Sequence, residues 1–284
     1  MWPRREDSAL LSHRSRAHAA HALAQVAATL FGALALAPLT VIAQTTDQVN
    51  QANSPLTPSI TANLQDLYAP RLYDSDGSSN SLLLRGVLPH ALGGMPQIVR
   101  GTLPITSAPD VNGNTTGLGD LNLFDLVLFK QGSMALGIGP QLTVPTATDP
   151  VLGTGKWQAG LAAVVVAPQA WGLMGALVTW QHSFAGPSDR PTQNNLVVQP
   201  LLIYNLPQGV YLRSTANWNF DLARDNYVIP IGAGAGKVFL LSDGTTINVF
   251  AEPQWTIAHH GAGQPEFQVF MGVNLQFPLQ KKRP

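Results

Sequence analysis

The chain has 284 residues, and its 16 basic and 16 acidic side chains give a formal net charge of zero. Charged residues make up only 11% of the chain, which contains 26 glycines and 22 prolines. This is too little charge for an ordinary soluble surface, while the apolar content is too high for a disordered chain. A neutral chain has no overall field to attract nucleic acid, so we expect no such partner. The absence of cysteine excludes disulfides, thiolate metal sites and a cysteine nucleophile.

The first 43 residues have the order of a secretory signal peptide. A basic, arginine-containing region comes first, an apolar stretch follows at 26–37, and small or medium-sized residues precede Gln44. We therefore expect cleavage between Ala43 and Gln44. An uncleaved inner-membrane anchor is the alternative, but Pro38 interrupts a run that is already short for a spanning helix.

Two short segments flank the main body of the mature chain. Residues 44–58 are rich in Gln, Thr, Asn, Ser and Pro, with little to bury. This composition predicts a flexible segment that can hang in the periplasm or fold into a lumen. Residues 278–284 form a C-terminal tail, which leaves 59–277 as the folded domain.

The body of the chain repeats one pattern of apolar alternation. At 266–277 every second residue is large and apolar, which indicates a strand with one apolar and one mostly polar face. Tilted, such a strand crosses an apolar band of about 25 Å, as in outer-membrane barrels. Similar runs occur at 81–89, 97–106, 119–130, 133–145, 157–167, 172–184, 195–205, 209–221, 227–239 and 245–257. Residues 59–73 alternate less cleanly and fit either a first strand or a short internal helix. Bacterial single-chain barrels have even strand numbers, so we take 59–73 as one more strand and expect an all-β, up-and-down antiparallel transmembrane β-barrel of about 12 strands.

The connections between these runs alternate in length, as external loops and tight periplasmic turns do in such barrels. The mostly long ones are 74–80, 107–118, 146–156, 185–194, 222–226 and 258–265. The mostly short ones are 90–96, 130–133, 168–171, 205–209 and 240–244. The last strand then runs toward the periplasm, and we expect the protein in the bacterial outer membrane, among its lipids.

Aromatic residues gather near both ends of the runs. Those near the long connections are Trp157, Trp180, Trp218, Tyr227, Trp255 and Phe267. Those near the short connections are Phe129, Trp171, Tyr204, Phe239 and Phe277. Two such girdles are typical of a membrane barrel.

Two features compete with this pattern. No charged residue lies within 157–188, which is long enough for a transmembrane helix, but Pro168 and Gly172 favour a strand, a turn and another strand. Asp125 falls on the lipid face near mid-membrane, where a carboxylate is costly. Either a β-bulge turns Asp125 inward, or the strand is misplaced.

Two glycine-rich stretches resemble phosphate-binding loops only superficially. Both 153–157 and 232–238 contain a lysine, but no hydroxyl residue follows it to hold Mg²⁺, and neither stretch opens a predicted helix. The alternating glycines at 232–236 instead leave one face of a strand without side chains. We expect no cofactor.

The histidines do not indicate an enzyme. His182 and Ser183 are adjacent, so on a strand they point to opposite faces and cannot form a nucleophile–base pair with each other. His259 and His260 lie in a glycine-rich connection, and the sequence identifies no further ligands for a metal. We therefore expect neither catalysis nor a metal site.

The polar phase of the strands predicts which side chains line the lumen, and thus the solute path. The candidates are Arg85, Arg100, Asp120, Phe124, Gln199, Arg213, Asn217, Phe250, Glu252, Gln254, Gln268 and Phe270. Charges of both signs fit salt bridges that close the interior as well as they fit a polar conduit. Val197 and Leu201 share the inward phase with the three phenylalanines, and a partly apolar lumen suits a hydrophobic or aromatic solute.

Several segments together resemble one family. They are 84–90 (LRGVLPH), 116–120 (TGLGD), 145–149 (PTATD) with 153–157 (GTGKW), 182–186 (HSFAG) and the closing strand. They are similar to the bacterial outer-membrane proteins grouped as the MetA-pathway phenol-degradation type, over roughly 59–279. The resemblance implies an outer-membrane barrel that passes small molecules, aromatic ones among them, and it supplies no catalytic residue.

The closing strand also resembles the signal that the barrel-assembly machinery reads, with Gly272, Leu275 and Phe277 in matching places. It departs from that signal at Phe270 and in the tail at 278–284. We expect a channel or facilitated-uptake protein for small organic molecules. The alternative is a non-conducting barrel with a structural or surface-contact role, and the oligomeric state stays open.

Overall fold

The computed structural model describes residues 44–111, 113–131 and 133–279. The expected signal peptide at 1–43, including Ala43, lies outside these residues, as do residues 280–284 of the tail. Within the described part of the chain, no helix is both long and apolar enough to cross a membrane.

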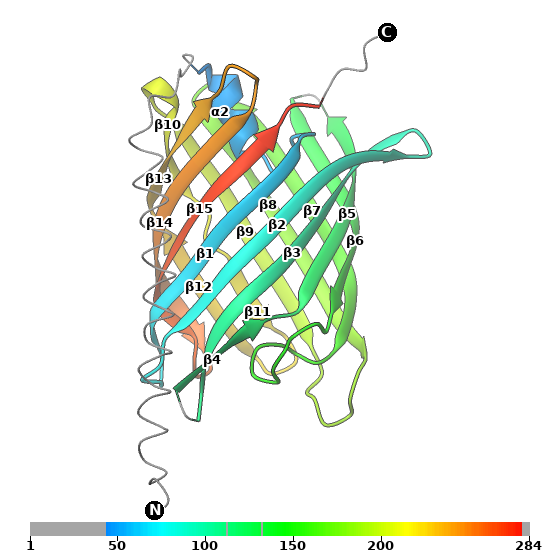
Figure 1. Ribbon diagram of the computed structural model, residues 1–284, viewed down its shortest axis with the longest axis vertical. Coiled ribbons are helices and arrows are strands. Elements are labelled where there is room, and N and C mark those ends of the chain that lie inside the picture. The colour runs from blue at the N-terminus through cyan, green and yellow to red at the C-terminus, as the bar shows by residue number, and fades with distance from the viewer. Residues whose placement is uncertain (1–43, 112, 132, 280–284) are drawn as a thin grey trace, which may run out of the picture. The chain divides into compact units, whose positions relative to one another are not determined.

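One antiparallel sheet curls round and closes on itself (Figure 1). Its first strands are β1 (Ile60–Leu72), β2 (Ser79–Leu92), β3 (Met95–Asp110), β4 (Gly113–Leu118), β5 (Leu121–Gln131), β6 (Met134–Val144), β7 (Trp157–Gln169) and β8 (Gly172–Ala185). The others are β9 (Asn194–Asn205), β10 (Val210–Ser214), β11 (Trp218–Asp221), β12 (Asn226–Gly232), β13 (Gly234–Leu240), β14 (Thr246–His260) and β15 (Pro265–Phe277). Ile60 of β1 lies opposite Phe277 of β15, and this pairing removes the free edge of the sheet.

The fifteen strand segments form the twelve long strands of the barrel wall, which we call staves. Short breaks at 119–120, 215–217 and Ala233 divide three staves into β4 with β5, β10 with β11 and β12 with β13. The predicted twelve-stranded barrel is confirmed, and β1 is the strand taken at 59–73. The alternative of one helix over 157–188 is wrong, because β7 and β8 pair across a tight turn.

The two ends of the barrel differ, and we call them the turn end and the loop end. At the turn end, drawn at the top of Figure 1, short connections join neighbouring strands. The β2–β3 turn is Gly93-Gly94, and both glycines have the positive φ that a two-residue hairpin turn requires. The loop end carries the longer connections, among them 145–156 and 186–193.

Two predicted connections are wrong in extent. The region 90–96 is strand except for its two central glycines, so β2 and β3 extend beyond the wall as a long hairpin (Figure 1). The predicted loop at 107–118 is a second hairpin, in which Ser107 lies opposite Thr116. Backbone pairing, with polar side-chain bonds such as Thr116 to Ser107, holds these extensions, and their sequences lack the apolar alternation that would have revealed them.

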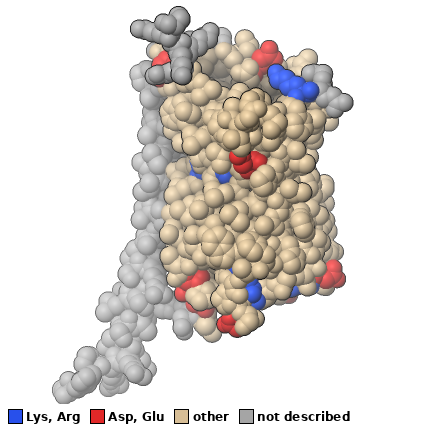
Figure 2. Space-filling view, turned by 90° about the vertical axis from the view of Figure 1, so that its right-hand side faces the viewer, with Lys and Arg blue, Asp and Glu red and all other residues tan. Residues whose placement is uncertain are grey.

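The outer surface of the barrel is apolar. Leu88, Leu161 and Ile257 are each more than half exposed, which is unusual for a soluble monomer. On the face shown in Figure 2, charged side chains lie mainly toward the two ends, apart from a small charged group part-way up. Near the loop end the rings of Trp255 and Phe267 lie 5.4 Å apart between centroids, in one of the two predicted aromatic girdles.

Asp125 corrects the sequence interpretation. It follows the inward, buried Phe124 and so faces outward, in a strand that is correctly placed and whose register on β6 is the same on both sides of it. No bulge turns it inward. Its carboxylate oxygens instead lie 2.9 and 3.1 Å from Nε2 of His90. His90 reaches it because β2 continues through a position that the sequence analysis assigned to a turn.

A helix, α2 (Thr46–Asn53), lies inside the wall at the turn end (Figure 1). Thr45 begins it with a capping box, in which its hydroxyl accepts from the Gln48 N–H while the Gln48 side chain accepts from the Thr45 N–H. These bonds satisfy two backbone donors at the helix start. The segment 44–58 therefore has a structured core within the lumen, whereas the sequence predicted only a flexible segment that could enter it.

The apolar face of this segment belongs to the core of the barrel. Val49, Ala52 and Leu56 are buried in one cluster with inward-facing side chains of the wall, including Phe124 and Phe250. Part of the inward apolar surface that suggested a hydrophobic solute is therefore covered by the chain itself.

Candidate functional site

The candidate site is a cavity inside the barrel, beside the chain that follows α2. Its volume is about 140 Å³, and residues 52–57 contribute part of its lining. The wall contributes polar and aromatic side chains from several staves. Those lining residues include Asn63, Gln65, Arg85, Arg100, Gln199, Leu201, Arg213, Phe250, Phe270 and Asn274. Residues distant in sequence meet here because each is the inward member of its strand.

Arg213 is held by a fully buried carboxylate. Its Nε lies 2.7 Å from Oε2 of Glu252, whose side chain has no exposed surface. Glu252 also accepts from the backbone N–H and the hydroxyl of Thr215, each at 2.7 Å, and from Gln254 at 3.2 Å. This number of donors compensates the carboxylate for the loss of water. The guanidinium of Arg213 is thereby fixed 3.7 Å from the centroid of the Phe250 ring.

Arg85 and Arg100 have different surroundings. Arg85 donates from Nε to the hydroxyl of Thr102 at 3.0 Å and from Nη1 to Oε1 of Gln65 at 2.7 Å. Arg100 lies over the ring of Phe124, 4.0 Å from its centroid. Its buried Nε has no hydrogen-bond partner among the residues that the structure describes. Both cations therefore face the cavity with neutral neighbours.

Amide side chains form short chains of hydrogen bonds along the inner wall. Gln268 donates to Gln254 at 2.6 Å, and Gln254 continues the chain to Glu252. On the other side, Oε1 of Gln181 accepts from Gln141 at 2.8 Å and from Thr143 at 2.9 Å. Buried polar groups that bond each other in this way leave fewer free positions for a solute, so much of the predicted polar phase is structural.

Asp120 serves the loop end. It accepts from the backbone N–H and hydroxyl of Thr154, at 2.7 and 2.8 Å, and from the N–H of Ala147 at 3.2 Å. Arg190 completes this arrangement by donating to the carbonyls of Pro150, Gly153 and Thr154. These bonds connect the two long connections 145–156 and 186–193, which places Asp120 in loop anchoring.

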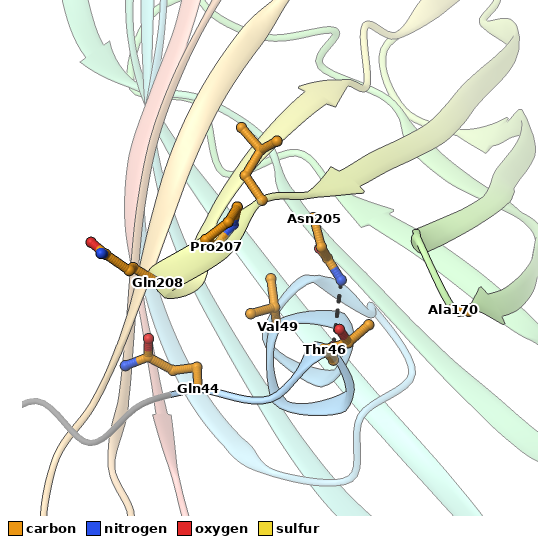
Figure 3. Close-up of a pocket in the computed structure, with 8 residues that line it drawn as sticks. Gln44, Thr46, Val49, Ala170, Asn205, Pro207 and Gln208 are labelled. Atoms are coloured by element: carbon orange, nitrogen blue, oxygen red, sulfur yellow. Dashed lines mark hydrogen bonds between the residues drawn. The ribbon is translucent and has the colours of Figure 1, made fainter.

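The helix α2 is attached to the wall by amides. Asn205 donates to Oδ1 of Asn50 at 2.8 Å and to the carbonyl of Thr46 at 3.4 Å, the bond dashed in Figure 3. On the other side, Asn248 and Gln276 both donate to the carbonyl of Ala52, at 3.1 and 3.2 Å. These bonds hold both ends of the helix.

A second pocket lies between α2 and the rim of the barrel. It has a volume of about 260 Å³ and is bounded on the wall side by the turn that contains the 3₁₀ helix η1 (Pro207–Gly209). Figure 3 shows Gln44 and Val49 on the chain side of this pocket. A gap therefore separates the helix from this part of the wall at the turn end.

The twelve predicted lumen residues fall into three groups. Six line the cavity: Arg85, Arg100, Gln199, Arg213, Phe250 and Phe270. Four are buried and adjoin it or continue its hydrogen-bond chains: Phe124, Glu252, Gln254 and Gln268. The remaining two lie elsewhere, since Asp120 holds a loop and Asn217 lies in the break between β10 and β11.

The sequence analysis missed the residues of the lumen segment itself. Asn50, Ala52 and Leu56 carried no periodic signal, because α2 has only eight residues. A capping signal was present in the Thr45–Gln48 pair. Also missed were Tyr211 and Asn248, which are joined by a buried hydrogen bond of 2.6 Å.

The histidine motifs have local partners. The hydroxyl of Ser183 accepts from the backbone N–H of Gln193 at 3.0 Å, within the β8–β9 connection. His259 stacks on Tyr73, with 3.5 Å between ring centroids. Within the described residues, no three His, Cys, Asp or Glu side chains are grouped so that they could hold a metal ion.

The fold is similar to that of an outer-membrane channel of known structure. No protein-family model matches the chain, and no curated protein does. A crystal structure of an outer membrane channel from Pseudomonas putida F1 is similar in fold, with a TM-score of 0.60 and 16% sequence identity. The match covers 79% of this chain and 98% of that channel. The β domain of a Bordetella autotransporter matches with a TM-score of 0.43 and 14% identity, over 77% of this chain and 100% of that domain.

Proposed function

We propose that the protein is an outer-membrane channel or facilitated-uptake protein for small molecules, hydrophobic or aromatic ones among them. The observation that carries this proposal is the cavity of about 140 Å³ inside the closed wall, lined by Arg213, Phe250 and Phe270. The apolar exterior supports insertion in a bilayer, and the likeness to a known channel supports the membrane and the class. In this orientation the turn end faces the periplasm and the loop end faces outward.

The lumen segment is the gate in this proposal. An isolated helix of eight residues is unstable in water, so α2 depends on its contacts with the wall. Its amide bonds to Asn205, Asn248 and Gln276 are neutral, and individually each contributes about 1 kcal/mol. In this proposal the segment narrows the turn end and moves aside when a solute passes.

A reversible crosslink tests the gate. The protein has no cysteine, so in Asn50→Cys/Asn205→Cys the two new thiols are the only ones. A short thiol crosslinker suits this pair, because the two native side-chain amides meet at 2.8 Å. We expect the reduced variant to admit small aromatic solutes into liposomes faster than the unmodified protein, and the crosslinked form to admit them at least about tenfold more slowly than the reduced form.

The control for this experiment is each single-cysteine variant treated with the same reagent. Equal solute entry in the crosslinked and reduced forms would show that displacement of α2 is not required. No entry in any form, with a folded barrel shown by heat-modifiable migration on a gel, would remove the transport proposal altogether.

The second candidate is a non-conducting barrel that works through its loops. The occupied turn end favours it, as does the anchoring of 145–156 to 186–193 through Arg190. In that case Arg190→Ala would weaken contact with a partner surface, while solute entry would be absent in every variant. The first candidate predicts the opposite result in both measurements.

We also propose that the protein belongs to the MetA-pathway phenol-degradation type, passes aromatic solutes and has no catalytic activity. The sequence motifs support these three points. Recognition by the barrel-assembly machinery is proposed for β15, whose pairing with β1 closes the barrel. Truncation after Phe277 tests the tail: if the tail hinders recognition, the truncated protein assembles faster in the outer membrane.

A further inference from the structure

We propose that the cavity beside residues 52–57 is a binding site for a small organic anion, whose carboxylate lies against Arg85 and Arg100. This proposal rests on the proposed function, since it names the class of solute that the same cavity takes. The site is assigned by charge, by strand register and by the aromatic side of the cavity.

Charge is the first argument. Three arginines line the cavity, and its described lining contains no aspartate or glutamate. Glu252 neutralises Arg213 from behind the lining, whereas Arg85 bonds only neutral groups among the described residues. Two cations without a counter-ion are unfavourable in a site with little water. An anionic solute supplies the missing charge.

Register is the second argument. Arg85 lies opposite Thr102, and Arg100 lies opposite Val87, so the two arginines are diagonal neighbours on the inner face of β2 and β3. Diagonal positions are about 7–8 Å apart, which long side chains span easily. The buried Nε of Arg100 still lacks a partner in the described part of the chain. Planar guanidinium groups match a carboxylate through paired hydrogen bonds.

The aromatic lining of the cavity is the third argument. The rings of Phe250 and Phe270 lie 5.0 Å apart between centroids, at an angle of 59°, and Leu201 lines the same cavity. A volume of about 140 Å³ is below the usual range of about 300–1,000 Å³ for drug-sized ligands. The solute that fits both the arginines and the aromatic rings is therefore a carboxylate with a single ring.

Equilibrium dialysis of the folded, detergent-solubilised barrel tests the site directly. The probes are benzoate, acetate, which has the charge without the ring, and benzyl alcohol, which has the ring without the charge. We expect benzoate to be retained best, and Arg85→Gln/Arg100→Gln to lower its retention at least about tenfold. The matched control is Arg71→Gln, which removes an exposed cation outside the cavity and should leave retention unchanged.

Bilayer recordings of the same proteins separate this site from the proposed function. We expect the unmodified channel to prefer anions in a salt gradient, and the double variant to lose that preference while Arg71→Gln keeps it. A conducting barrel that retains benzoate no better than benzyl alcohol would overturn the anion site and leave the channel intact. Benzoate retention without any conductance would overturn the channel and leave the site.

Discussion

Two carboxylates of the wall, one on each face, have different surroundings. Glu252 faces inward, has no exposed side-chain surface, and accepts hydrogen bonds from an arginine, a threonine and a glutamine. Asp125 faces outward and meets one residue, His90, with about a third of each side chain exposed. The inner carboxylate is part of a network, whereas the outer one has a single partner.

The difference follows from what each face offers. Inward-facing positions on neighbouring strands are polar, so a buried charge can collect several donors there. The outward face is apolar, so a charge on it depends on one partner placed by strand register. The network around Glu252 should therefore resist the loss of a minor donor, and the outer pair should fail when either partner is lost.

Replacement of the inner carboxylate should have the largest effect. Glu252→Gln leaves Arg213 buried without a counter-charge, so we expect the free energy of unfolding to fall by about 3–5 kcal/mol. Urea unfolding of the barrel in lipid vesicles, followed by tryptophan fluorescence, measures this change. The control is Glu266→Gln, which removes a mostly exposed pair with Arg71 and should change stability by less than about 1 kcal/mol. Equal effects of the two variants would contradict the proposed importance of burial.

Loss of the outer partner comes next. His90→Leu leaves Asp125 alone on the apolar face, and we expect a loss of about 2–3 kcal/mol in the same unfolding measurement. The double variant His90→Leu/Asp125→Leu removes both polar groups and should return close to the stability of the unmodified protein. A double variant less stable than the single one would show that the pair does more than satisfy its own charge.

The smallest effect should come from a single donor within the inner network. Thr215→Val removes the hydroxyl bond to Glu252 and the acceptor of Arg213 Nη2, while the backbone N–H of residue 215 and Arg213 Nε still donate to the carboxylate. We expect a loss of about 1.5 kcal/mol, measured as before. A loss as large as that of Glu252→Gln would show that the carboxylate cannot redistribute its bonds.

Much of the barrel could be predicted because the pattern that marks each strand lies within a short stretch of sequence. Alternation along β15 reports which side chains face outward and which face inward, and two-residue periodicity needs no tertiary information. Arg85 and Arg100 were placed inward by the same rule. His90 was missed because β2 continues past the run of apolar alternation that marked it in the sequence.

The sequence by itself determined the class of fold, the strand count and the inward and outward faces of the wall. Tertiary structure alone decided which inward charges are neutralised, because the pairing of Arg213 with Glu252 joins strands that are distant in the chain. It also decided that α2 occupies the turn end, since a short helix without its own periodic signal is stabilised only by the wall around it. The cavity and its two uncompensated arginines are products of that closure.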